Sequence, residues 1–262
     1  MAPWIERLAR LGYVAKAVLY MTIGALAAGG AVGYVGGKTT GTRGAMKTIV
    51  DTEFGRVMLA GVALGLFGYA VWRVIEGITD PERRGSNAKG IALRISFVVR
   101  GLVHGALAVS AAKLVMGGHV GSDGDGSKHW VARALEVPGG RYLLWATAGA
   151  LFGFGVYQLY RAWATKLSEK LELGSIDPRA RRVIVGISRF GIAARGIVFA
   201  TLGVLFARAA SHLNAKEVGG TPESMNEILR FGKWPFIAVS VGLIAYGLYE
   251  LLNARFRRIR VT

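Results

Sequence analysis

The chain has 262 residues, of which 52% are hydrophobic and 38 are glycine, a composition typical of a membrane protein whose helices pack closely in lipid. Its formal net charge of +17 would suggest a nucleic-acid partner in a soluble protein. Here the basic residues lie mostly between apolar stretches, where anionic headgroups account for them, so we expect no nucleic-acid binding. The absence of cysteine excludes disulfides, iron–sulfur clusters and thiol catalysis.

Six predominantly apolar stretches follow one another along the chain, and each is long enough to cross about 30 Å of hydrocarbon as a helix. They lie at about 11–35, 57–77, 95–116, 142–163, 187–210 and 235–254. In the loop inside each successive pair we expect a short amphipathic helix at the membrane surface, such as the one with Met46, Ile49 and Val50 on its apolar edge. The sequence therefore predicts an all-α, multi-pass integral membrane protein.

The distribution of basic residues predicts the orientation of these spans. Apart from three basic residues deep within spans, 18 Lys and Arg lie on the side of the two termini and 12 lie on the opposite side. Loops rich in Lys and Arg remain in the cytoplasm during insertion, so we predict that both termini are cytoplasmic.

A repeat divides the chain into three similar parts. The segments RLGYVAKAVLYMTIG, RISFVVRGLVHGALA and RFGIAARGIVFATLG, which begin at Arg10, Arg94 and Arg189, align without a gap. The second stretch of each pair also matches, because a glycine at 55, 140 or 232 precedes by fourteen positions the aromatic residue at 69, 154 or 246. We therefore predict three units of two helices each, at 1–79, 80–168 and 169–262.

With this threefold repeat, the sequence resembles the bacterial membrane proteins that contain the domain of unknown function 1206. The resemblance implies a pair of transmembrane helices that occurs three times in one chain, and a location in the bacterial cytoplasmic (inner) membrane. It implies no activity and no catalytic residue. Because each unit has two spans, all three units enter the membrane in the same orientation, and we predict three tandem helical hairpins in a pseudo-threefold arrangement about the membrane normal.

Small and aromatic residues recur four positions apart along one face of each helix, and we predict that these faces pack helix against helix. The predicted packing stripe consists of Gly12, Tyr20, Gly24, Gly61, Gly65, Tyr69, Phe154, Gly191, Phe199, Gly203, Gly242 and Tyr246.

One basic residue lies deep within each odd-numbered stretch: Lys16, Arg100 or Arg195. Each lies six residues, or about 9 Å, beyond the arginine that opens its repeat. Such a charge is tolerated if it reaches the membrane interface or forms an ion pair, for which Glu76 and Glu250 are candidate partners. Alternatively, the three bases converge as an anion-attracting ring or a lipid-headgroup pocket, and the sequence leaves both interpretations open.

The sequence contains no recognisable arrangement for catalysis. No predicted span has Asp or Glu near its middle, and the histidines match no ligand spacing, so we predict no catalytic residue, no metal site and no cofactor. The acidic segment GSDGDGSKHW, which begins at Gly121, lacks the glutamate that completes a calcium loop and is expected to be a flexible turn.

These observations predict a non-enzymatic scaffold, a partner-binding module or a lipid-interacting module. The expected partners are the anionic headgroups of the bilayer, with another protein or a second copy of the chain as further candidates. The alternative function is a channel or carrier for a small solute, such as an anion, along the pseudo-threefold axis.

Overall fold

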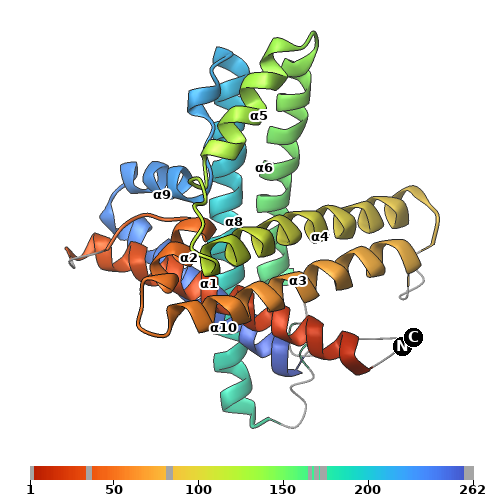
Figure 1. The fold of residues 1–262 in the computed structure, drawn as a ribbon, viewed down its shortest axis with the longest axis vertical. Coiled ribbons are helices and arrows are strands. Elements are labelled where there is room, and N and C mark those ends of the chain that lie inside the picture. The colour runs from red at the N-terminus through yellow and green to blue at the C-terminus, as the bar shows by residue number, and fades with distance from the viewer. Residues whose placement is uncertain are drawn as a thin grey trace.

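The computed structural model describes residues 3–33, 37–80, 85–164, 167, 171 and 176–256, and the regular elements within them are all helical (Figure 1). The six long helices are α1 (Pro3–Ala31), α3 (Gly55–Thr79), α4 (Ala88–Val115), α6 (Gly140–Ala164), α8 (Pro178–His212) and α10 (Lys233–Phe256). The loops hold the shorter helices α2 (Thr42–Val50), α5 (Asp125–Glu136) and α9 (Thr221–Arg230), and the 3-10 turn η2 (Ala215–Glu217).

Three of the long helices begin well before the apolar stretches on which they were predicted, among them α4, which begins at Ala88 instead of about residue 95. Helix α1 begins at Pro3 instead of about residue 11, and α8 begins at Pro178 instead of about 187. At the start of α8, the carboxylate of Asp177 accepts hydrogen bonds from the backbone N–H groups of Arg179 and Ala180, so a polar cap sets the boundary. Residues 34–35 of the first predicted span and the predicted unit boundary at 168–169 lie outside the described residues.

Five of the six long helices, α1, α3, α4, α8 and α10, are long and apolar enough to cross a membrane. Helix α6 has 25 residues but is not among the five, because glycines, tyrosines and Gln158 dilute its apolar content. The length and composition of its helices therefore make the chain a multi-pass membrane protein.

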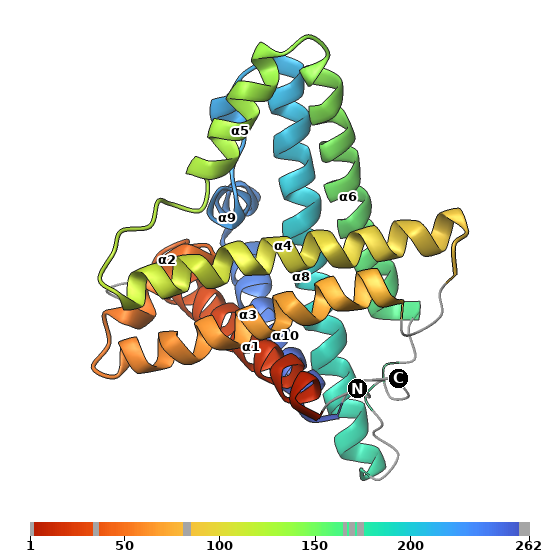
Figure 2. The same ribbon diagram turned by 45° about the vertical axis from the view of Figure 1, so that its right-hand side comes forward.

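The most extensive packing joins helices of different repeats. Helix α3 lies along α4, α6 lies along α8, and α10 lies along α1, so the second helix of each repeat packs against the first helix of the next, and the third repeat returns to the first. Within repeats, α1 packs on α3 and α8 packs on α10, whereas α4 and α6 have no comparable contact over their described residues. In Figure 2 the α6–α8 pair crosses the α3–α4 pair steeply, so the second repeat differs from the compact hairpin that was predicted.

We call the first and third repeats closed, because their two long helices pack on each other, and the second repeat open, because α4 and α6 diverge. Glycine lies at the contacts of the closed repeats. A Cβ added at Gly12 would overlap Tyr69 of α3, and a Cβ added at Gly191 would overlap the backbone of Tyr246 in α10. The position equivalent to these two glycines in the second repeat is Ser96, whose side chain would occupy the space that such a close approach needs. The helices α4 and α6 instead use their small residues against α3 and α8: a Cβ at Gly101 would meet Ala70 and Val74, and one at Gly155 would meet the backbone of α8.

The remaining glycines of the predicted stripe also divide between packing within repeats and packing between repeats. Gly65 faces α1 and Gly242 faces α8, so both serve the packing within repeats, whereas Gly24 faces α10 and Gly203 faces α6, between repeats. Gly61 is the exception, because no heavy atom lies within 4 Å of a Cβ built there.

The loops between the helices of each repeat hold one another in place. The carboxylate of Asp123 accepts hydrogen bonds from the N–H groups of Arg43 (2.8 Å) and Gly44 (3.1 Å) at the start of α2, so the acidic segment that was expected to be a flexible turn caps a helix of the first repeat. Lys128 lies 3.4 Å from the carboxylate of Glu223 in the third repeat. Thr39 of the first repeat donates a hydrogen bond to Asn226 of the third (2.9 Å), so every pair of repeats is joined.

Candidate functional site

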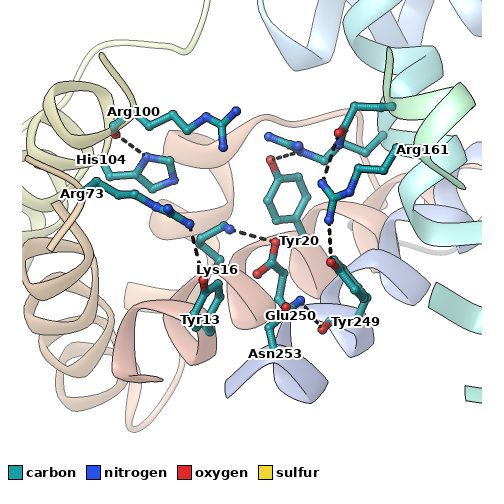
Figure 3. A network of polar contacts seen from close by, with 12 residues as sticks. Tyr13, Lys16, Tyr20, Arg73, Arg100, His104, Arg161, Tyr249, Glu250 and Asn253 are labelled. Atoms are coloured by element: carbon teal, nitrogen blue, oxygen red, sulfur yellow. Dashed lines mark hydrogen bonds and ion pairs between the residues drawn. The ribbon is translucent and has the colours of Figure 1, made fainter. Parts of the chain in front are cut away.

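A cluster of charged and aromatic side chains lies where the three helix pairs meet (Figure 3). All three of the predicted deep bases, Lys16, Arg100 and Arg195, contribute to it. Phe154 joins two of them, since its ring centroid lies 5.8 Å from the guanidinium carbon of Arg100 and 5.5 Å from that of Arg195. The polar members of this group are Lys16, Arg73, Glu76, Arg100, Gln158, Arg161, Arg195 and Glu250. We call them, with the aromatic rings that they contact, the central cluster.

Pairs of aromatic rings fix the helices around the central cluster. Each pair joins the second helix of one repeat to the first helix of the next, at equivalent positions. The pairs are Tyr69 with His104 (4.7 Å between centroids), Phe154 with Phe199 (5.0 Å) and Tyr246 with Tyr20 (4.7 Å). These contacts explain why the repeats pack in the order seen in the fold, and they bring together all the aromatic residues of the predicted stripe.

Each deep base also lies over the aromatic ring of its own repeat. The distances from the charged group to the ring centroid are 4.9 Å for Lys16 and Tyr69, 5.8 Å for Arg100 and Phe154, and 4.9 Å for Arg195 and Tyr246. A cation over an aromatic face is attracted by the ring quadrupole, and this attraction strengthens where water is excluded. The repeat therefore places the three bases in equivalent surroundings of rings.

The charge partners of the three bases differ, in contrast to the rings. Lys16, which is 8% exposed, forms a buried ion pair with Glu250 at 2.8 Å. The positions equivalent to Glu250 in the other repeats hold Arg73 and Gln158. One base thus has a carboxylate partner, and the sequence offers the others an amide and a second cation at the equivalent positions.

Arg195 forms no ion pair within 4 Å among the described residues, although the carboxylate of Glu250 is close enough to attract its charge. Its Nε donates a hydrogen bond to the hydroxyl of Tyr20 at 3.0 Å. Gln158 lies alongside, because its Cβ is 3.2 Å from a Cβ built at Gly196, the next residue on α8. Gln158 is only 1% exposed, and its Nε2 has no hydrogen-bond partner among the described residues.

Arg100 has a like-charged neighbour. The guanidinium carbons of Arg73 and Arg100 lie 5.3 and 5.9 Å from the centroid of the same ring, Phe97. Arg73 forms an ion pair with Glu76, one helical turn further along α3, and its Nε lacks a hydrogen-bond partner within the described chain. Figure 3 shows Arg100 reaching from α4 toward the middle of the cluster, where no described carboxylate or hydrogen-bond acceptor meets its guanidinium.

The predicted ion-pair partners thus separate: Glu250 lies against a deep base, whereas Glu76 lies against Arg73. Sequence reasoning missed the roles of Arg73, Gln158 and Arg161. Arg161 donates hydrogen bonds to the hydroxyl of Tyr249 at 2.7 Å and to Oε1 of Gln158 at 3.3 Å. A signal for the first two was present, since both lie four positions after the repeated aromatic residue and differ in charge from the residue in the third copy.

Comparison with known proteins identifies the repeat. A family described as Domain of Unknown Function (DUF1206) matches the chain three times, at residues 11–80, 95–165 and 190–257. The chain belongs to this family. Each match to the DUF1206 domain contains one deep base and one ring from the second helix of its repeat, so the central cluster is built from one contribution per domain.

A protein of Bacillus subtilis (strain 168), described as the uncharacterized protein YxxB, is 26% identical to the chain over 259 residues. The similarity covers 98% of this chain and 93% of the Bacillus protein, so it extends over all three DUF1206 domains. No solved structure matches the chain.

Proposed function

We propose that the protein crosses the bacterial cytoplasmic membrane six times, with both termini in the cytoplasm. The length of α6 and its close packing along α8 support a sixth span, and the excess of Lys and Arg on the side of the termini supports the orientation. The native chain has no cysteine, so single cysteines report topology cleanly. Ser211→Cys is expected to react with an impermeant thiol reagent from outside, and Ser86→Cys only after the membrane is opened. Labelling of Ser86→Cys in intact cells would contradict the orientation.

The three units are proposed to stand in a pseudo-threefold arrangement about the membrane normal. Three observations support this arrangement: the equivalent aromatic pairs, the equivalent positions of the deep bases over their rings, and the packing of α10 back onto α1. The open second repeat is a departure from exact symmetry.

The function that this geometry supports best is a non-enzymatic, lipid-interacting module that holds an anionic group at the central cluster. The observation that carries the proposal is the excess of positive charge among side chains that are buried or partly buried. Five cationic side chains, Lys16, Arg73, Arg100, Arg161 and Arg195, meet two carboxylates there, those of Glu76 and Glu250. Positive charge without a partner in a partly dehydrated site is costly, and an anion between Arg100 and Arg195 offsets this cost.

Ligand-dependent stability tests this function. Purified protein in a neutral detergent is titrated with an anionic phospholipid or with inorganic phosphate, and its thermal unfolding is followed. We expect at least one of these probes to raise Tm for the wild-type chain and not for the double variant Arg100→Gln/Arg195→Gln. The matched control is Lys113→Gln/Arg208→Gln, which removes one exposed charge from each of the same two helices. Equal stabilisation of both double variants would contradict an anion site at the cluster.

A second candidate is a carrier for a small anion, because one deep base from each repeat lies at the common centre of the helices. The aromatic pairs fill that centre, so passage would require them to separate. Uptake of an anion into proteoliposomes that is lost on Arg100→Gln would favour the carrier over the static module.

A further inference from the structure

Helices α4 and α6 have no comparable contact over their described residues, so no helix contact within a repeat covers the side of the central cluster between them, and we call this side the α4–α6 opening. Arg100 and Phe154 contact each other across this opening, and Arg100 is partly exposed, in contrast to the buried Lys16. Val103 and Tyr157 lie three positions after Arg100 and Phe154 on the same helical faces, and they are 53% and 54% exposed. Exposed apolar and aromatic side chains thus lie about one helical turn from the partly exposed cation and from its ring contact.

The hydrogen-bond donors around Arg100 suit a phosphate group. A guanidinium presents paired N–H donors that match two phosphate oxygens, and two guanidinium groups share Phe154 here. Gln158, which is 1% exposed, packs against α8 at Gly196, and its amide N–H group has no partner among the described residues, which is an observation independent of the charges. Arg100 also has no carboxylate partner among the described residues, whereas Lys16 pairs with Glu250 and Arg73 pairs with Glu76.

We propose that an anionic phospholipid docks in the α4–α6 opening, with its phosphate between Arg100 and Arg195 and its acyl chains against Val103 and Tyr157. This inference rests on the proposed function and names its ligand. A phospholipid fits better than a free anion because the opening faces sideways between two membrane helices and has exposed apolar walls. Arg100 lies about 9 Å beyond Arg94, a depth at which a headgroup drawn slightly inward can meet it.

The test compares three probes on the full chain in a neutral detergent: phosphatidylglycerol, phosphatidylcholine and inorganic phosphate. Native mass spectrometry measures the lipid retained, and thermal unfolding measures stabilisation. The wild-type chain is expected to retain phosphatidylglycerol in preference to phosphatidylcholine. Arg100→Gln is expected to weaken this retention about tenfold or more, because charge-assisted hydrogen bonds are lost. The matched control Lys113→Gln, an exposed charge on the same helix, is expected to retain lipid as the wild type does.

A second pair of variants tests whether the lipid docks between α4 and α6, without changing an arginine. Val103→Trp fills the opening and is expected to reduce retention of phosphatidylglycerol. Val109→Trp adds the same ring at an exposed position on a different face of α4 and is expected to leave retention unchanged. If Arg100→Gln does not fold, the wild-type lipid preference and this pair still decide the question.

The outcomes separate the two proposals. Stabilisation by inorganic phosphate that needs Arg100, without any preference for phosphatidylglycerol, would overturn lipid docking and leave the anion-holding function standing. Stabilisation by none of the probes would overturn both. Retention of phosphatidylglycerol that Arg100→Gln and Val103→Trp leave unchanged would place the lipid elsewhere and overturn docking in this opening.

Discussion

At the positions through which the helices of the first and third repeats pack, the second repeat has serine and alanine in place of glycine, and we expect this difference to decide where the protein is open. Where α1 meets α3 and α8 meets α10, glycines at Gly12 and Gly191 allow the helices to approach until no side chain fits between them. Ser96 on α4 corresponds to these two glycines, Ala150 on α6 corresponds to Gly65 and Gly242, and α4 and α6 diverge. A homologous unit can therefore be a closed hairpin or half of an opening, depending on a few side-chain atoms.

The charge partners follow the same division. In the first repeat, which is closed, the charge of Lys16 is neutralised by Glu250. In the second repeat, which is open, Arg100 lies beside Arg73. We therefore expect variants in the closed repeats to change mainly the stability of the protein, and variants in the open repeat to change mainly its retention of lipid.

The largest effect is expected for Glu250→Gln on the closed side. It leaves the charge of Lys16 buried without a partner, which should destabilise the protein by about 3–5 kcal/mol. Thermal unfolding in detergent measures the loss. Glu227→Gln, which disrupts the ion pairs with the partly exposed Arg208 and Arg230, is the control and should cost about 1 kcal/mol or less.

A double variant checks the cause of that loss. Lys16→Met combined with Glu250→Gln removes both charges and should recover part of the stability. If the double variant is as unstable as the sum of the single variants, the ion pair is not the source of the effect.

The next largest effect is expected for Gly191→Ala at the α8–α10 contact. The added methyl group overlaps the backbone at Tyr246, and separating the helices should cost about 1–3 kcal/mol in thermal unfolding. Gly61→Ala introduces the same group where no heavy atom lies within 4 Å, so it should leave Tm unchanged or raise it slightly. Equal losses at the two positions would show that close approach does not determine the closed repeat.

A smaller effect, a gain in stability, is expected when the second repeat is given a carboxylate at the position equivalent to Glu250. Gln158→Glu places a carboxylate beside Arg161, which already donates a hydrogen bond to Oε1 of Gln158 at 3.3 Å, and should stabilise the lipid-free protein by about 1 kcal/mol. It should also reduce the stabilisation by phosphatidylglycerol, because the carboxylate competes with the phosphate. Increased retention of the lipid in this variant would contradict the role of the unfilled donors.

The sequence predicts the helices and the repeat well because both are local or periodic properties. Apolar length identifies the long helices, and the gapless alignment of the segments from Arg10, Arg94 and Arg189 identifies the repeat. The start of α8 was missed because its first turns are polar, with Arg179, Arg181 and Arg182, and hydropathy does not register a capped polar extension.

The central cluster is harder to predict because its partners come from different repeats. The ion pair of Lys16 with Glu250 joins the first odd helix to the last even helix, and nothing in the spacing along the chain states that these two meet. The missing information is the order of packing around the molecule, with each second helix against the following first helix. Once that order is known, the repeat alone assigns Glu250, Arg73 and Gln158 to the three bases.

The smallest change in stability and the most direct test of the comparison come from Ser96→Gly combined with Ala150→Gly. Two helical glycines cost about 1 kcal/mol each, but closer packing of α4 on α6 should offset most of that loss. Spin labels on Val103→Cys and Tyr157→Cys, both exposed, should then approach by up to about 2 Å, the spread that side-chain size produces in interaxial distances. Retention of phosphatidylglycerol should fall as the opening narrows, even though no charge has changed. The control Ala106→Gly, at an exposed position on α4, should alter neither quantity. If the labels do not approach, Ser96 and Ala150 are not what holds the second repeat open, and the packing of α4 on α3 and of α6 on α8 is sufficient to separate them.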